Sequence, residues 1–420
     1  MASSWRRTPM RTRFYRGILV VAAVLTAATL ATSAPSVPAA HPAGDFVPDE
    51  LLVKFAPGVS PEPVARTVGA RIIGRIPALG VYVLKVPLGT LDATLLALSR
   101  NPLVEYAEVN GIATALVIPD DPYADGVTCY NSSHHGCVSQ WAWGKIQAYD
   151  AWGITTGSTG VKVAVVDTGI DSAHPDLPAL APGANFVNIG APPEDDNGHG
   201  THVAGTIGAL TNNATGVAGL NWAISLVPVK VLDASGSGTY SAVANGITWA
   251  ADNGAKVINL SLGGSVPSKT LEGAVKYAWS KGAVLACAAG NSGTSQKLYP
   301  AAYTNCIAVA ATDESDQKAS FSNYGNWVDV AAPGVHILST MPDSPVYLTT
   351  QYGYSQGYDS LNGTSMATPH VAGVAGLIWA RGVCSTNTCV RSRIETTADP
   401  IPGTGTFWTW GRINAVRALE

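Results

Sequence analysis

The stretch Val161-Lys162-Val163-Ala164-Val165-Val166-Asp167-Thr168-Gly169 is a short, mainly apolar run that ends in a carboxylate and a turn. Similar apolar runs recur further along the chain, with helical stretches between them. They are Val161–Val166, Leu226–Val231, Val257–Leu260, Val284–Ala288 and Ile307–Ala310. This βαβ alternation predicts a parallel sheet covered by helices, and hence an α/β domain from about residue 117 onward.

Asp167 stands where the first of these predicted strands ends, and Thr168-Gly169 should turn the chain sharply there. Ligand-binding and catalytic groups collect at the carboxyl ends of parallel strands. Asp167 is therefore a candidate catalytic residue. The alternative is an aspartate that only caps a helix.

Two further motifs accompany this carboxylate. One is Asn197-Gly198-His199-Gly200-Thr201-His202-Val203-Ala204-Gly205, and the other is Gly363-Thr364-Ser365-Met366-Ala367-Thr368-Pro369-His370. A serine hydroxyl is too weakly acidic to attack an acyl carbon at neutral pH. A histidine must take its proton, and a carboxylate must fix the histidine tautomer. Together the three motifs predict an acid, a base and a nucleophile.

The order of these groups along the chain is Asp, His, Ser. Chymotrypsin-type enzymes run His, Asp, Ser, and α/β-hydrolases run Ser, Asp, His. From about Asp121 to the C-terminus the chain resembles the subtilisin-like serine proteases (subtilases), and among them the thermitase group most closely. The resemblance implies a three-layer α/β fold with a mainly parallel central sheet. It also implies a serine endopeptidase that works through an acyl-enzyme.

The resemblance assigns Asp167, His199 and Ser365 to the catalytic triad. Asn291, which closes Ala288-Ala289-Gly290-Asn291, would donate a hydrogen bond to the oxyanion. His202 lies three residues after His199 and is expected to pack along the helix instead.

Ser365 begins a predicted helix that continues from Met366 to Ile378. Free N–H groups and the dipole at such a helix start favour negative charge. Pro369 is expected to be tolerated because it falls near the helix start, where few N–H groups have partners.

Two glycine-rich segments resemble the pair that holds an extended substrate in the family, Ser235-Gly236-Ser237-Gly238 and Ser261-Leu262-Gly263-Gly264. Glycines leave backbone groups free to pair with any peptide, so broad specificity is expected. Gly263-Gly264 and Ala289-Gly290 bound the family's S1 pocket, and counting back from Tyr299-Pro300 places Leu298 near its base. The pocket segments contain no Asp or Glu, which favours an apolar or aromatic P1 residue over Lys or Arg.

The resemblance also implies a structural Ca²⁺ site built from hard oxygen ligands. Its ligands would be two carboxylates, one side-chain amide and three backbone carbonyls, from Asp121, Asp176, Asn213, Leu210, Thr215 and Val217. A second calcium site of the thermitase group is not matched. Asn185, Asn188 and Gly190 stand where its acidic ligands would be, with Asp195 and Asp196 nearby.

The first 34 residues have the pattern of an export signal. Five arginines between Arg6 and Arg16 precede Ile18–Ala31, an apolar run that is short for a membrane span. Cleavage could follow Ala34 or Ala40, and a membrane anchor is the alternative. We expect a secreted, extracellular and monomeric protein without membrane contact after signal removal.

Residues 45–116 are expected to form a compact unit before the domain at 117–420. Alternating patterns predict strands at 50–55, 81–86 and 104–109, with helices at 60–68 and 91–98. This order resembles the small α+β, ferredoxin-like inhibitory propeptide of subtilases, and an accessory domain is the alternative. Ile112–Leu116 could lie in the cleft as a product-like strand, with the enzyme cutting near Leu116–Val117.

Six cysteines in an exported chain suggest disulfides. Sequence neighbours give the preferred pairs Cys129–Cys137 and Cys384–Cys389. Cys287 and Cys306 could pair, or they could remain two buried thiols on adjacent strands.

Charge is distributed unevenly, with +4 in the first 118 residues and −8 in residues 119–420. An acidic, lysine-poor body argues against nucleic-acid binding and leaves polypeptides as the expected substrates. Two other functions remain open at this stage, a catalytically silent binding protein on the same fold and an acyl-transferring peptide ligase.

Overall fold

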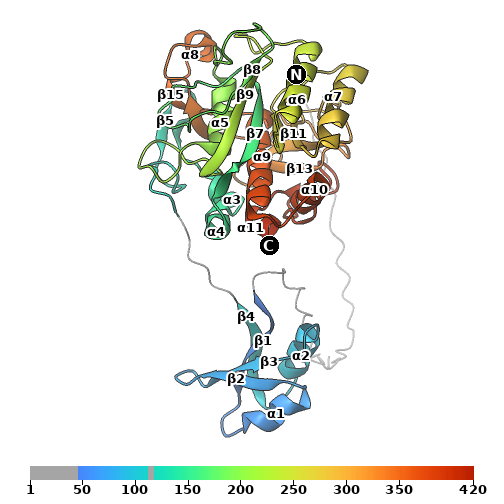
Figure 1. Ribbon diagram of the computed structural model, residues 1–420. Coiled ribbons are helices and arrows are strands. Elements are labelled where there is room, and N and C mark those ends of the chain that lie inside the picture. Colours follow the sequence, from blue (N-terminus) through green and yellow to red (C-terminus); the bar gives the residue numbers. More distant parts are fainter. Residues whose placement is uncertain (1–45, 112–117) are drawn as a thin grey trace, which may run out of the picture.

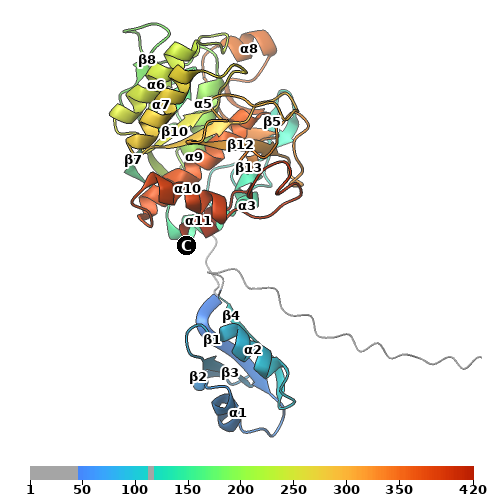
Figure 2. The same cartoon turned by 90° about the vertical axis from the view of Figure 1, so that its right-hand side faces the viewer.

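The computed structural model describes residues 46–111 and 118–420. They form a smaller and a larger unit, one from each range (Figures 1 and 2). The predicted signal segment and the predicted processing stretch at 112–117 lie outside the described residues. Within the described ranges, no helix is long and apolar enough to cross a membrane.

The smaller unit is an antiparallel sheet with two helices. Its elements are β1 (Phe46–Phe55), α1 (Pro61–Thr67), β2 (Arg71–Ile76), β3 (Val81–Lys85), α2 (Leu91–Ser99) and β4 (Val104–Gly111). The strand order β2-β3-β1-β4 and the succession β-α-β-β-α-β are ferredoxin-like. The sequence predicted every element except β2, an edge strand whose residues are exposed or half-buried and show no clear apolar alternation.

The larger unit is organised around an eight-stranded sheet in the order β16-β13-β12-β11-β10-β7-β9-β8, in which every pairing is parallel. The strands are β7 (Gly157–Asp167), β8 (Ala184–Asn185), β9 (Ala223–Lys230), β10 (Val257–Leu260), β11 (Val284–Ala288), β12 (Cys306–Thr312), β13 (Val330–Pro333) and β16 (Gly411–Arg412). The five predicted strands correspond to β7, β9, β10, β11 and β12. The α/β prediction is confirmed.

Helices cover both faces of this sheet (Figure 1). Successive side chains of a strand point to opposite faces. Val163 and Val165 of β7 accordingly pack in one core with α5 (His199–Gly208) and α9 (Thr364–Arg381). Ala164 and Val166 pack in a second core with α6 (Tyr240–Asp252) and α7 (Lys269–Ser280).

The remaining elements lie around this frame. The helices are α3 (Ala142–Lys145), α4 (Ala148–Ile154), α10 (Asn387–Thr396) and α11 (Ala415–Leu419). A short hairpin joins β5 (Tyr130–Ser132) to β6 (Gly136–Val138). A second hairpin pairs β14 (Ile337–Met341) with β15 (Gly357–Leu361) and carries α8 (Tyr347–Tyr352) in its connection.

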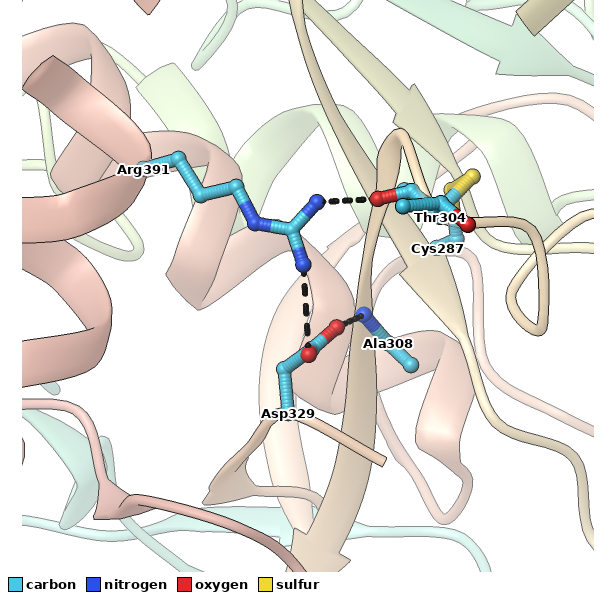
Figure 3. Close-up of a disulfide and its surroundings, with 6 residues drawn as sticks. Cys287, Thr304, Ala308, Asp329 and Arg391 are labelled. Atoms are coloured by element: carbon cyan, nitrogen blue, oxygen red, sulfur yellow. Dashed lines mark hydrogen bonds and ion pairs between the residues drawn. A yellow bond between two sulfur atoms is a disulfide. The ribbon is translucent and has the colours of Figure 1, made fainter. Parts of the chain in front are cut away.

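All six cysteines are paired, as Cys129–Cys137, Cys287–Cys306 and Cys384–Cys389. The second bridge ties β11 to the start of β12 (Figure 3). Beside it, Arg391 of α10 donates to the carbonyl of Thr304 and pairs with Asp329 at 3.2 Å (Figure 3). Burial raises the pKa of Asp329 to about 6 although Arg391 pulls it down. The disulfide thus holds β11, the strand that leads to Asn291, against β12.

Candidate active site

Asp167 and His199 meet at the carboxyl edge of the sheet. Asp167 is the last residue of β7, and His199 is the first residue of α5. His199 Nδ1 lies 2.7 Å from Asp167 Oδ1, which also accepts the Thr168 N–H at 2.8 Å. Asp167 is fully buried, and its Oδ2 has no hydrogen-bond partner among the described residues. The carboxylate can therefore hold Nδ1 as the protonated nitrogen and leave Nε2 to accept a proton.

Glycines allow this close approach of β7 and α5. A Cβ at Gly200 would lie 2.1 Å from the carbonyl oxygen of Gly169, and Gly169 itself has a φ of +110°. Only glycine adopts that backbone region readily. A side chain at Gly200 would force β7 and α5 apart, and one at Gly169 would clash with the carbonyl oxygen of Glu194 at 2.5 Å.

The electrostatics of His199 favour its charged form. Burial alone lowers the pKa of the imidazole, but the charge and hydrogen bond of Asp167, with the charge of Asp195, outweigh burial. The net result is a pKa raised above the ordinary histidine value. His199 is thereby suited to take up a proton during a reaction.

Asp195 fixes the loop before α5, a role that the sequence analysis missed. Its Oδ1 accepts the N–H groups of Asn197 at 3.0 Å and Gly198 at 2.8 Å. Its Oδ2 accepts the N–H of Thr201 at 2.8 Å and its hydroxyl at 2.6 Å. Aspartate side chains often accept hydrogen bonds from backbone N–H groups that follow them in the chain, which forms a turn. An aspartate just before the loop of His199 was therefore the signal available in the sequence. The neighbouring Asp196 pairs with Lys230 at 2.6 Å.

His202 lies on the buried side of α5, as expected. Its Nε2 is 2.9 Å from the carbonyl of Ile337 and 3.2 Å from that of Asp359. Burial, aided by the charge of His199, lowers its pKa to about 3. It is a neutral packing residue of the core.

Ser365 is the second residue of α9, so its N–H has no acceptor within the helix. Its hydroxyl donates to the carbonyl of Ser261 at 3.0 Å, and no bond joins Ser365 to His199 among the described residues. Catalytic hydrogen bonds are often absent or long without substrate. Both side chains line the same cleft.

Pro369 requires a correction to the sequence analysis. It is the sixth residue of α9, beyond the first turn, so a proline there removes a helical hydrogen bond to the carbonyl of Ser365. The hydroxyl of Ser261 replaces that bond, donating to the same carbonyl at 2.7 Å. Ser261, which lines the cleft, thus supplies a hydrogen bond to the carbonyl that Pro369 leaves without its helical donor.

Asn291 follows β11, and Thr364 fixes its orientation. Its Oδ1 accepts both the N–H and the hydroxyl of Thr364 at 2.9 Å. A backbone N–H can only donate, so the facing atom must be the amide oxygen, and the NH₂ group must point elsewhere. The amide nitrogen lies near Gly363, two residues before Ser365. The sequence analysis did not anticipate this role of Thr364.

A cleft of about 660 Å³ passes over these groups. Among the predicted site residues it is lined by His199, Ser365, Ser235, Gly236, Ser237, Gly238, Ser261, Leu262 and Gly263. Gly264, Ala289, Gly290, Asn291 and Leu298 are not among the lining residues. Leu298 lies directly behind the wall, because a Cβ at Gly263 or Gly290 would come within 2.5 Å or 3.1 Å of its Cδ2.

The cleft also has an apolar lining that the sequence analysis missed. It comprises Leu232, Tyr240, Val243, Leu271, Tyr347, Leu348, Tyr352 and Tyr354. Leu232 precedes and Tyr240 and Val243 follow the first glycine-rich segment, and Leu271 follows the second. The last four come from α8 and the residues after it, between the two strands of the β14–β15 hairpin. No local pattern links them to the triad motifs.

The predicted calcium ligands converge on the loop after α5. Asp121 Oδ2 accepts the N–H of Asn212 at 2.7 Å, and Asp176 accepts Asn213 Nδ2 at 2.8 Å and the N–H of Val217 at 2.9 Å. Both carboxylates are buried, and Asp121 Oδ1 has no hydrogen-bond partner among the described residues. Those residues hold no cluster of three or more His, Cys, Asp or Glu, so a cation here would need amide and carbonyl oxygens as well.

Comparison with known families agrees with this geometry. The model of the subtilase family matches residues 158–411, which include the triad candidates and Asn291. The chain belongs to the subtilase family. A second family model, the fervidolysin N-terminal prodomain, matches residues 32–110 and so covers the whole smaller unit apart from its last residue. The chain is a subtilisin-type serine protease with an N-terminal prodomain.

Individual relatives support the same conclusion. Thermitase of Thermoactinomyces vulgaris is 52% identical over 303 residues, which span 72% of this chain and 99% of thermitase. A thermophilic serine proteinase of Bacillus sp. (strain AK1) is 45% identical over 386 residues, 90% of this chain and 89% of the relative. A solved protease structure from Pseudoalteromonas arctica PAMC 21717 is 33% identical with a TM-score of 0.64, covering 72% of this chain and 99% of its own.

Proposed function

We propose that this subtilase is a secreted, propeptide-activated endopeptidase in which Asp167, His199 and Ser365 form the triad. Asn291 donates to the oxyanion. The observation that supports the proposal most strongly is the 2.7 Å contact of His199 with buried Asp167, in the cleft that Ser365 also lines.

The reaction begins when the Ser365 hydroxyl turns from the carbonyl of Ser261 toward His199 Nε2. His199 takes the proton as Ser365 Oγ bonds to the substrate carbonyl carbon, and Asp167 stabilises the imidazolium. The Asn291 amide and the Ser365 N–H stabilise the oxyanion. His199 then protonates the leaving amine, and water releases the acyl group by the reverse steps.

Activity is expected to rise with pH through neutrality and then level off. His199 must be neutral to act as base, and Asp167 raises its pKa above the usual value of about 6.5. The inflection in kcat/KM should therefore lie above about pH 6.5. A pH profile on an uncharged peptide substrate checks this. A kcat/KM that falls as pH rises from 5 to 8 would contradict the role of His199.

The P1 preference is expected to be apolar or aromatic. Leu298 lies behind both Gly263 and Gly290, and neither Asp nor Glu lies in the predicted pocket segments. Cleavage-site profiling on a peptide library should show Leu, Phe or Tyr leading at P1. Leading Lys or Arg would overturn the pocket assignment while leaving the triad untouched.

We also propose that Ca²⁺ binds at Asp121, Asp176, Asn213 and the carbonyls of Leu210, Thr215 and Val217. The two buried carboxylates have no ion-pair partner among the described residues, and burial raises the pKa of Asp176 to about 6. A divalent cation would offset the cost of burying two negative charges. The site would tie residue 121, near the proposed mature N-terminus, to the body of the enzyme.

Removing calcium is expected to lower the melting temperature of the mature enzyme. A ligand that binds only the folded state adds about 2.7 kcal/mol when its free concentration is about 100 times Kd. Differential scanning fluorimetry with calcium and with excess chelator measures this. Asp176→Ala should abolish the difference, whereas Asp125→Ala, an exposed aspartate of the same segment, should keep it. Equal melting temperatures in calcium and chelator, with metal removal verified, would contradict the site.

We propose that maturation removes an export signal and then the inhibitory propeptide. Residues 1–34 would direct export, with cleavage as late as residue 40. Residues 45–116 would inhibit the enzyme domain until it cuts near Leu116. The match to a prodomain family supports an inhibitory segment.

Product analysis tests the proposed reaction. Mature enzyme is incubated with a defined peptide, and the products are weighed by mass spectrometry. Hydrolysis gives two fragments whose summed mass exceeds that of the substrate by one water. Rejoined or cyclised products as the main outcome would favour the peptide-ligase alternative, since the same acyl-enzyme can react with an amine.

A further inference from the structure

Ser261 and Ser365 are joined by two hydrogen bonds of opposite direction. The Ser365 hydroxyl donates to the carbonyl of Ser261 at 3.0 Å, and the Ser261 hydroxyl donates to the carbonyl of Ser365 at 2.7 Å. In the proposed reaction the Ser365 hydroxyl leaves the first bond and turns to His199. Of the two bonds, only the one from the Ser261 hydroxyl then remains to hold Ser365.

A third buried group fixes the direction of this remaining bond. Asn259 Nδ2 lies 2.9 Å from Ser261 Oγ. The Ser365 carbonyl can only accept, so the Ser261 hydroxyl must give it its single proton. The lone pairs of Ser261 Oγ then need a donor, which the Asn259 NH₂ group supplies and its amide oxygen could not. These three groups form a relay that runs from Asn259 through Ser261 to the carbonyl of Ser365.

Strand β10 places the relay under α9. Side chains alternate along a strand, so Val257 and Asn259 point to the same face. Val257 packs in the core that contains α9 residues, whereas Ile258 and Leu260 pack in the other core. Ser261 follows the strand and points to α9 as well, since it bonds to both Asn259 and the start of that helix. Figure 2 shows α9 beside β10.

Asn259 is an unfavourable residue for its position if only stability is considered. It is fully buried, in a strand that pairs with β7 on one side and β11 on the other. Its Oδ1 has no hydrogen-bond partner among the described residues. A buried acceptor without a partner is destabilising, and an apolar side chain of similar size would avoid that cost. This favours a role for the NH₂ group that offsets the cost.

Pro369 explains why the Ser365 carbonyl needs a donor from outside the helix. In a regular helix the N–H of residue 369 would donate to this carbonyl, and proline has no N–H. The carbonyl belongs to the same residue as the nucleophile, so its position helps to fix the Cα from which the hydroxyl projects. Misplacing a reacting group by about 1 Å can lower a rate by about 10².

We propose that Asn259 and Ser261 are positioning residues for the nucleophile, which supply to the Ser365 carbonyl the hydrogen bond that Pro369 cannot. The inference rests on the proposed role of Ser365. It gives a part in catalysis to Asn259, which is not among the residues that line the cleft.

A double-mutant cycle tests the relay. Pro369→Ala returns a helical N–H to the Ser365 carbonyl, so the Ser261 hydroxyl should become dispensable in that background. Ser261→Ala should lower kcat for a peptide substrate by about tenfold or more when Pro369 is present, with little change in KM. In the Pro369→Ala background the same change should cost less than about threefold. Each ratio compares two enzymes that differ only at residue 261, so the activity of Pro369→Ala itself does not enter.

Asn259→Leu repeats the test from outside the cleft. Leucine has a similar size but no donor, so kcat should fall by about threefold or more with Pro369 and by less than about twofold in the Pro369→Ala background. Combined with Ser261→Ala it should cost nothing further, because the bond that Asn259 directs is already lost. Thermal melts verify that each variant is folded. If Ser261→Ala did not fold, the Asn259→Leu pair would decide.

Ser339→Ala is the matched control. The buried Ser339 hydroxyl also donates to a helix carbonyl at 2.7 Å, that of His202. That carbonyl keeps a helical donor, because residue 206 is a threonine. Its kcat should stay within about twofold of wild type. Equal losses from Ser261→Ala in both backgrounds, or from Ser339→Ala and Ser261→Ala, would overturn the relay. A wild-type enzyme without peptidase activity would overturn the proposed function instead.

Discussion

Replacing Ser365 by alanine is expected to lower kcat by about 10⁶, the loss known for the nucleophile of subtilisin. The variant loses only a hydroxyl whose bond is to the carbonyl of Ser261. The reverse bond, from the Ser261 hydroxyl to the carbonyl of residue 365, remains and should keep α9 intact. Peptide turnover measures the activity, and a thermal melt by circular dichroism measures the fold. A folded variant that keeps a tenth of wild-type activity would contradict the assignment.

The same variant also tests self-processing. If the enzyme cuts its own propeptide, Ser365→Ala should accumulate as a precursor that still carries residues 46–111. Expression in a host without other extracellular proteases, followed by N-terminal sequencing, gives the answer. Normal maturation would show that another protease makes the cut, even if Ser365 remains the nucleophile.

Replacing Asn291 by alanine is expected to lower kcat by about 10²–10³ with little change in KM, as known for the corresponding amide of subtilisin. The amide stabilises charge that appears only in the transition state. Alanine also removes the acceptor for Thr364, so a second variant is needed. Asn291→Asp keeps an oxygen for Thr364 but adds a charge that repels the oxyanion.

The two variants separate a catalytic from a structural role. If Asn291 only positioned Thr364, Asn291→Asp would recover activity, whereas the proposal predicts a loss at least as large as in Asn291→Ala. Asn362→Ala serves as a control, because Asn362 lies three residues from Ser365 and bonds instead to the N–H of His336. Its kcat should stay within about twofold of wild type.

Local patterns were sufficient to predict five of the eight strands of the sheet and the triad candidates, but not the short strands β8, β13 and β16. Buried parallel strands are continuous apolar runs, so β7, β9, β10, β11 and β12 could be located directly. Asp167 stands at the end of such a run, where parallel strands place catalytic groups, and the two other motifs singled it out as the triad acid. In the smaller unit, alternation located every strand except β2, whose exposure leaves no apolar pattern, and the family resemblance implied the ferredoxin-like fold.

The parts that could not be predicted depend on contacts between distant segments. The Ser261 hydroxyl donates to the Ser365 carbonyl, which lacks its helical donor because of Pro369. The two residues are 104 positions apart, so no rule for proline in helices predicts this bond. Thr364 orients Asn291 across 73 residues. The tyrosines of α8 reach the cleft only because the β14–β15 hairpin packs on α5.

Active-site labelling tests the central claim most directly. The mature enzyme is treated with a fluorophosphonate, which reacts with activated serines, and the modified peptide is identified by mass spectrometry. The account predicts one label per molecule, on Ser365, with loss of activity in proportion to labelling. It predicts no label in the His199→Ala variant, whose serine has no base. A label on another residue, or undiminished labelling without His199, would contradict the Asp167–His199–Ser365 triad.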